Sequence, residues 1–391
     1  MEVMSFWGVN TFPDGVIGFC QYCDRAKLKN ILDNVIDEVR FLSELKEIFC
    51  HPKDDSLMSA IRRGRSEVVE YLTKYQTDTE KTGYIALAAY LGNLDYLRLL
   101  HQRQYAWTDA ACVDAALQGH FTCLQYLHEN GCPWGYRVYI KSASNQHWAC
   151  FKYVAEKGLS WHVDVAKRLA QWKEANMLQY AIEHGCPVDL TVMQEAISSG
   201  EADSVRILLN VDCPIPIGSC LVAAKGGFLE CLILLHEHGA SWDGEASIAA
   251  ASADHLPCLQ YLHEQGCPWD EKTTEDAAKY GRLSSLRYAM ENECPYNDDI
   301  VAISAGAPSI DCLRYLIEEQ GLFMGDDGKA FLTAMLFGKA QSVQYLIDQG
   351  CDIHNCSISA QAILNRKDWI LSVLPSGDEL LLKCFRIAFF A

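Results

Sequence analysis

Two sets of side chains in this sequence are of the kinds that bind metal ions. The first is the pair Cys20 and Cys23, with Cys50 and His51 further along the chain. Three thiols and one imidazole are a set that can hold zinc tetrahedrally. However, Cys50 and His51 are adjacent, not separated by two residues, which makes joint coordination awkward. We therefore predict two semi-buried cysteines in a terminal cap, with a zinc site as the less favoured alternative.

The second set is a group of histidines with a regular spacing. A 27-residue period, or a multiple of it, separates His101, His128, His236 and His263. A histidine that recurs in one position of a unit indicates a packing or hydrogen-bonding role, which we predict in preference to a row of metal sites. The sequence also has no phosphate-binding Gly-rich loop, no Gly-x-Ser-x-Gly and no His-Glu-x-x-His. We expect no metal, no cofactor and no catalytic residue, and thus a protein that is not an enzyme.

The same 27-residue period runs through most of the chain. The segment 123–134 returns almost unchanged at 258–269, which is an offset of five periods. Tryptophan follows the same spacing, at Trp107, Trp134, Trp161, Trp242 and Trp269. Units of this size cannot bury an apolar face alone and must stack on their neighbours. The period therefore predicts a solenoid with a long surface for binding.

Charge and hydropathy narrow the possible partners. The formal net charge of the 391 residues is −18, whereas nucleic-acid-binding proteins carry basic patches. We therefore expect no nucleic-acid partner and consider a basic protein partner. The sequence has no apolar stretch of about 18 residues and no signal-peptide pattern at its start. These features predict no membrane partner and a monomer in the cytoplasm or the nucleus.

Most of the 18 cysteines belong to two ladders with the 27-residue spacing. The ladders are Cys123, Cys150, Cys231, Cys258 and Cys312, and Cys132, Cys186, Cys213, Cys267 and Cys294. Equivalent positions in packed helices lie about 8–10 Å apart, whereas a disulfide needs Cα atoms within about 7 Å. We therefore predict reduced, buried thiols, which are typical of an intracellular protein.

Each unit reads as two short helices with a tight turn between them. The first helix carries paired small residues, as in Ala115-Ala116, Ala223-Ala224, Ala250-Ala251 and Ala277-Ala278. The second carries Leu-x-Tyr-Leu, as in 124–127 and 259–262, whose spacing suits a buried helix. The unit closes with Gly-Cys-Pro-Trp, because Gly ends a helix and Pro prevents its continuation. We place the Trp at the start of the next helix, where Thr108, Asp109 or Asp270 can cap.

These pieces resemble the ankyrin repeat. The matching features are the Ala-Ala pair, Gly119-His120 at the turn, the Leu-rich second helix and Gly239-Ala240-Ser241 after it. The period departs from the family's usual value of about 33 residues, and the missing residues are those of the protruding finger. We therefore expect an all-α, ankyrin-like solenoid with short connections between repeats. His120 is expected to satisfy backbone groups at its turn.

The register divides the chain into three parts. We predict an N-terminal helical cap at 1–54, an array of about eleven ankyrin-like units at 55–352, and a degenerate unit and cap at 353–391. The piece 374–383 is faintly similar to the start of an F-box, which would make the chain a substrate adaptor for a ubiquitin ligase. A simple C-terminal cap is the favoured interpretation, and the adaptor is the alternative function.

The resemblance implies a protein partner bound along the concave face. Residues at the end of each first helix point to that face in ankyrin arrays. In this chain the candidate positions are Tyr90, Gln118, Asn145, Trp172, Lys279, Tyr280 and Phe337. Exposed Trp and Tyr are enriched among binding hot spots, so we expect Trp172 and Tyr280 to anchor the partner. The alternative, that each ring fills a gap between units, stays open.

Overall fold

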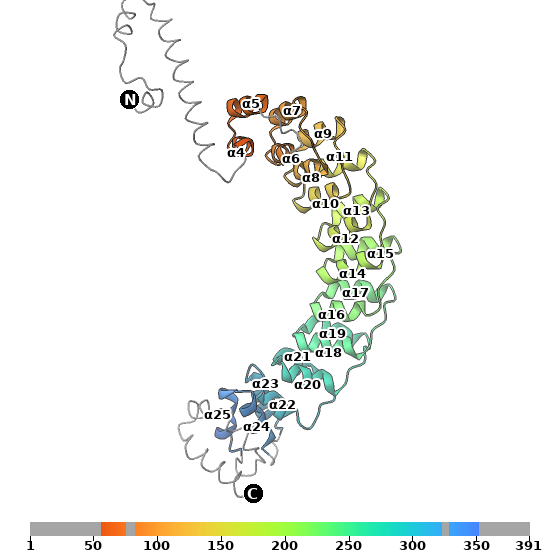
Figure 1. Cartoon of the computed structure of the whole chain (residues 1–391). Coiled ribbons are helices and arrows are strands. Elements are labelled where there is room, and N and C mark those ends of the chain that lie inside the picture. The colour runs from red at the N-terminus through yellow and green to blue at the C-terminus, as the bar shows by residue number, and fades with distance from the viewer. Residues whose placement is uncertain (1–55, 76–82, 323–327, 352–391) are drawn as a thin grey trace, which may run out of the picture. The chain divides into compact units, whose positions relative to one another are not determined.

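A computed structural model describes residues 56–75, 83–322 and 328–351 of the chain, and these residues form helices without any strand. They divide into two compact units, with the boundary between Ser160 and Trp161. Within each unit, short helices alternate between two layers (Figure 1). The even-numbered helices are the first helices of the repeats, and the odd-numbered helices are the second.

The first unit contains four helix pairs among its described residues. They are α4 (Ser56–Arg62) and α5 (Ser66–Tyr75), α6 (Gly83–Tyr90) and α7 (Leu94–Gln102), α8 (Asp109–Leu117) and α9 (Phe121–Glu129), and α10 (Arg137–Ser144) and α11 (Trp148–Glu156). Each helix packs on its hairpin partner and on the equivalent helix of the next repeat. First helices thus form one layer and second helices the other.

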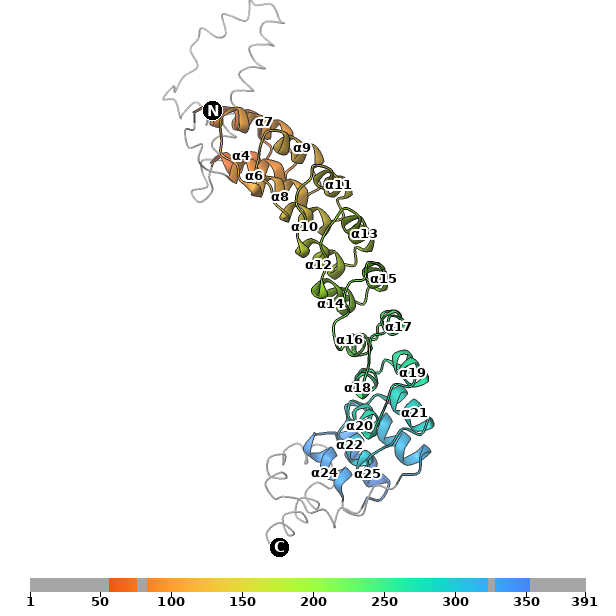
Figure 2. The same cartoon turned by 90° about the vertical axis from the view of Figure 1, so that its right-hand side faces the viewer.

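The second unit repeats this arrangement with seven pairs in its described part (Figure 2). They are α12 (Val163–Gln171) and α13 (Ala175–Glu183), α14 (Leu190–Ser199) and α15 (Ala202–Asn210), α16 (Ser219–Gly226) and α17 (Leu229–Glu237), α18 (Gly244–Ala253) and α19 (Leu256–Glu264), α20 (Glu271–Lys279) and α21 (Leu283–Glu291), α22 (Ile300–Ala305) and α23 (Asp311–Arg314) with η1 (Tyr315–Glu319), and α24 (Lys329–Leu336) and α25 (Ala340–Asp348). Connections between repeats are short, as between α13 and α14.

Left-handed backbone marks both ends of most second helices in the described residues, and the turn before α23 is an exception. In the turn before α9, Gly119 has φ +72° and its N–H donates to the Ala116 carbonyl. After α9, Gly131 has φ +83°. Some non-glycine residues take the same conformation at equivalent positions, namely Gln104, Gln146, Lys173, Asp212, Asp254 and Glu293. The backbone therefore keeps the repeat geometry even where the sequence loses glycine.

Small side chains and thiols fill the space between the layers. Ala115, Ala116, Ala277 and Ala278 are fully buried, as the helix spacing requires. All thirteen cysteines in the described residues are buried and free of disulfides. The prediction of reduced, buried thiols is confirmed for this part of the chain. Small uncharged side chains here let neighbouring helices approach closely.

Helix starts differ in how they are capped. The Asp270 side chain accepts from the Lys272 N–H at 3.0 Å, and Thr273 returns a bond to the Asp270 N–H, which completes a capping box before α20. Thr108 stands at the corresponding position before α8, but its side chain makes no capping hydrogen bond. Asp109 lies within the first turn of that helix and not at its cap. Asp270 is thus the effective cap among the three predicted residues.

Several predictions concern residues outside the described ranges. They are the N-terminal cap at 1–54, the cysteines at 20 and 23 with their Cys50-His51 partners, and the F-box-like piece at 374–383. These stay predictions, as do the domain limits. In the described ranges, no helix combines the length and the apolar character needed to span a membrane.

Candidate protein-binding surface

The predicted site residues lie where the first helices end. A helical hairpin is antiparallel, so the end of the first helix and the start of the second share one edge of the repeat. We name as the turn edge the four or five residues that precede each second helix. In the second unit the turn edge comprises 171–174, 198–201, 225–228, 252–255, 279–282, 306–310 and 336–339. It is one continuous border of the stacked repeats.

Large aromatic side chains are exposed along this edge. In the second unit, Trp172 is 37% exposed, Tyr280 is 44% exposed and Phe337 is 65% exposed. In the first unit, Tyr90 at the end of α6 is 42% exposed. Trp and Tyr are among the side chains most enriched at binding hot spots.

The polar candidates are placed differently from one another. Lys279 lies over the Tyr280 ring, with its Nζ 5.5 Å from the ring centroid. Asn145 is exposed, but its Nδ2 donates to the Leu117 carbonyl of the preceding repeat at 2.8 Å. Gln118 is half-buried. Lys279 and Tyr280 therefore form one exposed pair, whereas the Asn145 amide links two repeats.

A second set of contacts at the turn edge ties each repeat to the one before it. His120 Nε2 lies 3.1 Å from the Tyr90 carbonyl, and His147 Nε2 lies 3.1 Å from the Leu117 carbonyl. At the equivalent position of the second unit, Arg282 Nε donates to the Ser252 carbonyl at 2.9 Å. The prediction that His120 satisfies backbone groups is confirmed.

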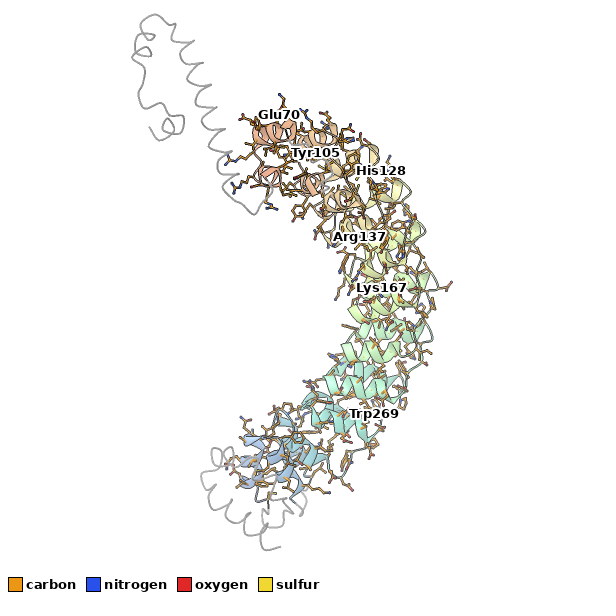
Figure 3. All side chains as sticks on the ribbon, viewed as in Figure 1. Glu70, Tyr105, His128, Arg137, Lys167 and Trp269 are labelled. Atoms are coloured by element: carbon orange, nitrogen blue, oxygen red, sulfur yellow. The ribbon has the colours of Figure 1, made fainter. Side chains whose placement is uncertain are left out.

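The repeated histidines are built into aromatic clusters on the second-helix layer. His128 Nδ1 lies 2.9 Å from the Tyr153 hydroxyl of the next repeat, and its ring stacks on Trp134 at 3.9 Å between centroids. His263 makes the same contacts with Tyr288 and Trp269. Figure 3 labels one member in each unit, His128 and Trp269. His101 and His236 complete the set, and the predicted hydrogen-bonding role is confirmed.

The tryptophans therefore pack differently from the prediction. We expect the Trp of Gly-Cys-Pro-Trp at the start of the following helix, but its ring stacks on the histidine six residues earlier. The sequence contains a signal for this contact, because Trp107, Trp134, Trp242 and Trp269 each follow a histidine of the ladder by six residues. Trp161 follows Ala155 instead. The histidine and tryptophan positions recur together because their rings are in contact.

Burial shifts the pKa values of several groups away from reactive ranges. Burial of its thiol raises the pKa of Cys258 to about 11, and the pKa of Cys150 likewise to about 11. Burial also lowers the pKa of His128, with a smaller contribution from the nearby Lys157 charge. A thiol with a raised pKa is a poor nucleophile at neutral pH, so these cysteines serve as packing residues.

The second unit has a shallow hollow among its described first helices. The hollow lies between α14 and α16 and has a cavity volume of about 30 Å³; its lining residues are Gln194, Ile197, Pro216, Ile217, Ser219 and Val222. Pockets for small ligands usually measure about 300–1,000 Å³ and enclose most of the ligand. Within the described ranges, no three His, Cys, Asp or Glu side chains gather in a way that could hold a metal ion.

Comparison with known proteins gives matches in structure but not in sequence. No protein-family model matches the chain, and no curated protein matches it. The ankyrin repeat domain of human ASB11 is similar over 56% of this chain and 96% of that domain, with 15% identity and a TM-score of 0.32. The pentatricopeptide repeat protein PPR10, solved with an 18-nt psaJ RNA element, is similar over 95% of this chain and 66% of its own length. Its identity is 12% and its TM-score 0.39.

The fold is defined by the geometry of the repeats themselves. Two short antiparallel helices, a left-handed turn between them and a short connection recur with the period of the sequence. Neighbouring repeats stack first helix on first helix and second on second. The chain is an ankyrin-like helical-repeat solenoid.

Proposed function

We propose that the chain is a non-enzymatic protein-interaction scaffold whose second unit binds a protein partner along its turn edge. The observation that carries this proposal is the exposure of Trp172, Tyr280 and Phe337 on one edge of stacked repeats. Such an edge offers a long, rigid surface at little ordering cost, because the backbone is already held by its neighbours.

The contacts of these rings support a binding role over a purely structural one. Side chains that hold the repeats together in the second unit, such as Leu178 and Leu259, are fully buried. Trp172 and Tyr280 instead keep more than a third of their surface uncovered. Covering them with a partner would therefore release a large apolar area from water.

Two observations support a role without catalysis. The described thiols are buried in the packing layers, and the ladder histidines are engaged with Tyr and Trp side chains. These groups are therefore explained by repeat packing. The buried, free thiols also favour a reducing compartment, the cytoplasm or nucleus, and we propose a monomer there.

The test compares two tyrosines with the same exposure. Tyr280 and Tyr296 are both 44% exposed, but Tyr296 lies in the connection before α22 and not on the turn edge. Proteins captured from a cell lysate by the unaltered chain, by Tyr280→Ala and by Tyr296→Ala would be quantified by mass spectrometry. A partner lost with Tyr280→Ala and kept with Tyr296→Ala is the expected result. Equal capture by all three chains would exclude the turn edge as the site.

A second variant separates binding from folding. Trp172→Ala should weaken capture of the same partner while the melting temperature changes little, because the ring is partly exposed. A large fall in melting temperature would instead assign Trp172 to the packing between repeats. Circular dichroism measured on the same preparations distinguishes the two results.

A further inference from the structure

The two edges of the second unit differ in charge. Its turn edge has five basic residues, Lys173, Lys225, Lys279, Arg282 and Lys339, and three acidic ones, Glu174, Glu201 and Asp254. The connection edge is made by five ten-residue stretches that start from the last residues of α13, α15, α17, α19 and α21. These stretches, 183–192, 210–219, 237–246, 264–273 and 291–300, hold thirteen acidic residues and one basic residue.

The turn edge therefore does not share the charge of the whole chain, which is −18. A first helix of nine residues is about 14 Å long, whereas the screening length at physiological salt is about 8 Å. Charges on the connection edge are therefore largely screened at the turn edge. The local potential there is set by the charged residues of the edge itself, among which basic residues outnumber acidic ones by two. Lys173 and Lys225 make no ion pair with any described residue, although the Lys173 charge acts on the nearby Glu201 carboxyl.

Aromatic and basic residues share the same repeats on this edge, and those repeats alternate with repeats that have small residues. Trp172 and Lys173 precede α13, and Lys279 and Tyr280 precede α21. The residues before α15 and α19 are instead Ser198-Ser199 and Ser252-Ala253. The alternation therefore has a period of two repeats.

The repeat of α16 and α17 follows the pattern through a different residue. Gly226 stands at the position of Trp172 and Tyr280, two repeats from each of them. The ring of Phe228 lies against Gly226 and fills the place that a side chain there would take. Lys225 precedes that glycine and is exposed. This repeat therefore has an exposed lysine beside a half-buried ring, which packs between Gly226 and Gly200 of the preceding repeat.

The fourth such repeat is that of α24 and α25. Phe337 precedes Gly338 and Lys339 there. Two 27-residue repeats after Tyr280 would be position 334, so Phe337 comes three residues late. The Phe337 ring packs beside Gly306 of the preceding repeat, since a Cβ at Gly306 would lie 3.0 Å from Phe337 Cδ2. Rings and small residues thus alternate along the edge.

The backbone at Lys173 is strained relative to glycine, as it is at Gln146 and Asp254 in the equivalent turns. Lys173 has φ +63°, whereas the equivalent turns before α15, α17 and α21 use Gly200, Gly227 and Gly281. A residue with a Cβ is less stable than glycine in this conformation. Strain of this kind is often found at functional positions.

We propose that the turn edge of the second unit binds an extended acidic peptide segment. The segment would place an apolar or aromatic side chain on each ring, with carboxylates between them that meet Lys173, Lys225 and Lys279. Two repeats span about 20 Å, and an extended chain advances about 3.3 Å per residue. One apolar anchor is therefore required at about every sixth residue. This proposal rests on the proposed function and specifies the chemistry of its partner.

The same residues suit a peptide better than a single-stranded nucleic acid. Binding to a phosphate backbone is driven by many cation contacts that release counterions. The turn edge has only two more basic than acidic residues, and its rings are about 20 Å apart, too far to stack successive bases. An acidic peptide needs fewer cations, because its anchors also bury apolar surface.

The experiment measures fluorescence anisotropy of the full chain with three labelled probes of equal length. The first is an 18-residue peptide of Glu and Asp with Leu at every sixth position. The second replaces its acidic residues with Lys, and the third is an 18-nucleotide uridine RNA. We expect binding of the acidic peptide alone, weakened by added salt. Tighter binding of the basic peptide or of the RNA would overturn the proposal, and so would no binding of any probe.

Two lysines of the same helix provide a matched comparison. Lys279 is at the turn edge of α20, and Lys272 is at its other end, 3.5 Å from Glu245. Lys279→Glu should weaken acidic-peptide binding about fivefold, because an anion that repels the peptide replaces one turn-edge cation. Lys272→Glu should leave the affinity unchanged. Equal effects of the two changes would show that overall charge, and not the turn edge, controls binding.

One further variant separates this proposal from a structural role. Lys173→Gly should raise the melting temperature, because it removes the left-handed strain, and should weaken acidic-peptide binding. A variant that gains stability and keeps its affinity would remove Lys173 from the site. If aromatic variants lose a captured partner while lysine variants keep it, the scaffold function stands and the acidic-segment proposal fails.

Discussion

The imidazole ring of His147 lies directly against Gly119 of the preceding repeat. A Cβ on Gly119 would be 2.5 Å from His147 Nδ1, a distance that real Cβ contacts essentially never reach. From that position His147 Nε2 reaches the Leu117 carbonyl at 3.1 Å. The turn glycine is thus required twice, for its φ of +72° and for the space that the next repeat's side chain occupies.

Replacement of this glycine should therefore cost more than backbone strain. Gly131 is the matched control, because it has φ +83° and nothing within 4 Å of an added Cβ. Gly131→Ala should lower the free energy of unfolding by about 1–2 kcal/mol. Gly119→Ala should lower it by about 1 kcal/mol more, because the His147 hydrogen bond is also lost. Urea denaturation gives both values, and equal losses would show that the ring moves aside freely.

The pKa of His128 should lie below 6.5 in the folded protein, chiefly because its ring is partly buried against Trp134 and Tyr153. As the pH falls, the His128 imidazole is therefore protonated in the unfolded chain before it is protonated in the folded protein. This histidine therefore contributes its full stability above pH 6.5 and loses it as the pH falls through 6.5 towards the folded pKa. NMR titration of the ring measures the value. Lys157→Gln should raise it, and a wild-type pKa above 6.5 would contradict the prediction.

Most thiols should be unreactive in the native protein. Of the 18 cysteines in the chain, thirteen are buried and free in the described residues, which leaves five others. Burial raises the pKa of Cys258 to about 11, so only about one in a thousand such thiols is ionised at pH 8. Ellman's reagent should titrate no more than five thiols quickly and all eighteen in denaturant. Rapid reaction of more than five would show that the packing layers open easily.

Helix capping should distinguish Asp270 from Thr108. Asp270→Ala removes a side chain that accepts the Lys272 N–H and completes a capping box, so it should lower the free energy of unfolding by about 1 kcal/mol. Thr108→Ala removes a side chain with no capping bond and should cost markedly less. Thermal and urea unfolding of the two variants measure the difference. A larger loss for Thr108→Ala would reverse this assignment.

The repeat pattern predicts the fold well because each position meets the same surroundings in every unit. Gly131 and Asp212 are chemically unlike, yet the 27-residue spacing places them in one column, and both have positive φ. The same logic predicts that the ladder cysteines are buried. It is less successful for Trp134, because a periodic column shows that a residue is structurally required but not which neighbour it contacts.

The exposed edge was only partly predictable. The alignment with ankyrin arrays predicts that Trp172 and Tyr280 end their first helices, and both are exposed there. It does not predict that Asn145 is bonded to the preceding repeat, or that Phe228 packs against Gly200 of the preceding repeat. These contacts join the turns of successive repeats. The relative positions of those turns depend on how the repeats pack together.

The helical repeat, its period and its turn positions can be read from the amino-acid sequence, because stacking of similar units imposes the same small, apolar and left-handed positions in each. The structure is needed to see which histidines reach a neighbour, which rings stay exposed and which lysines gather on one edge. Those properties depend on distances between residues that are one or two repeats apart in the chain. Antiparallel pairing of the helices brings such residues to one edge, and composition alone does not show this.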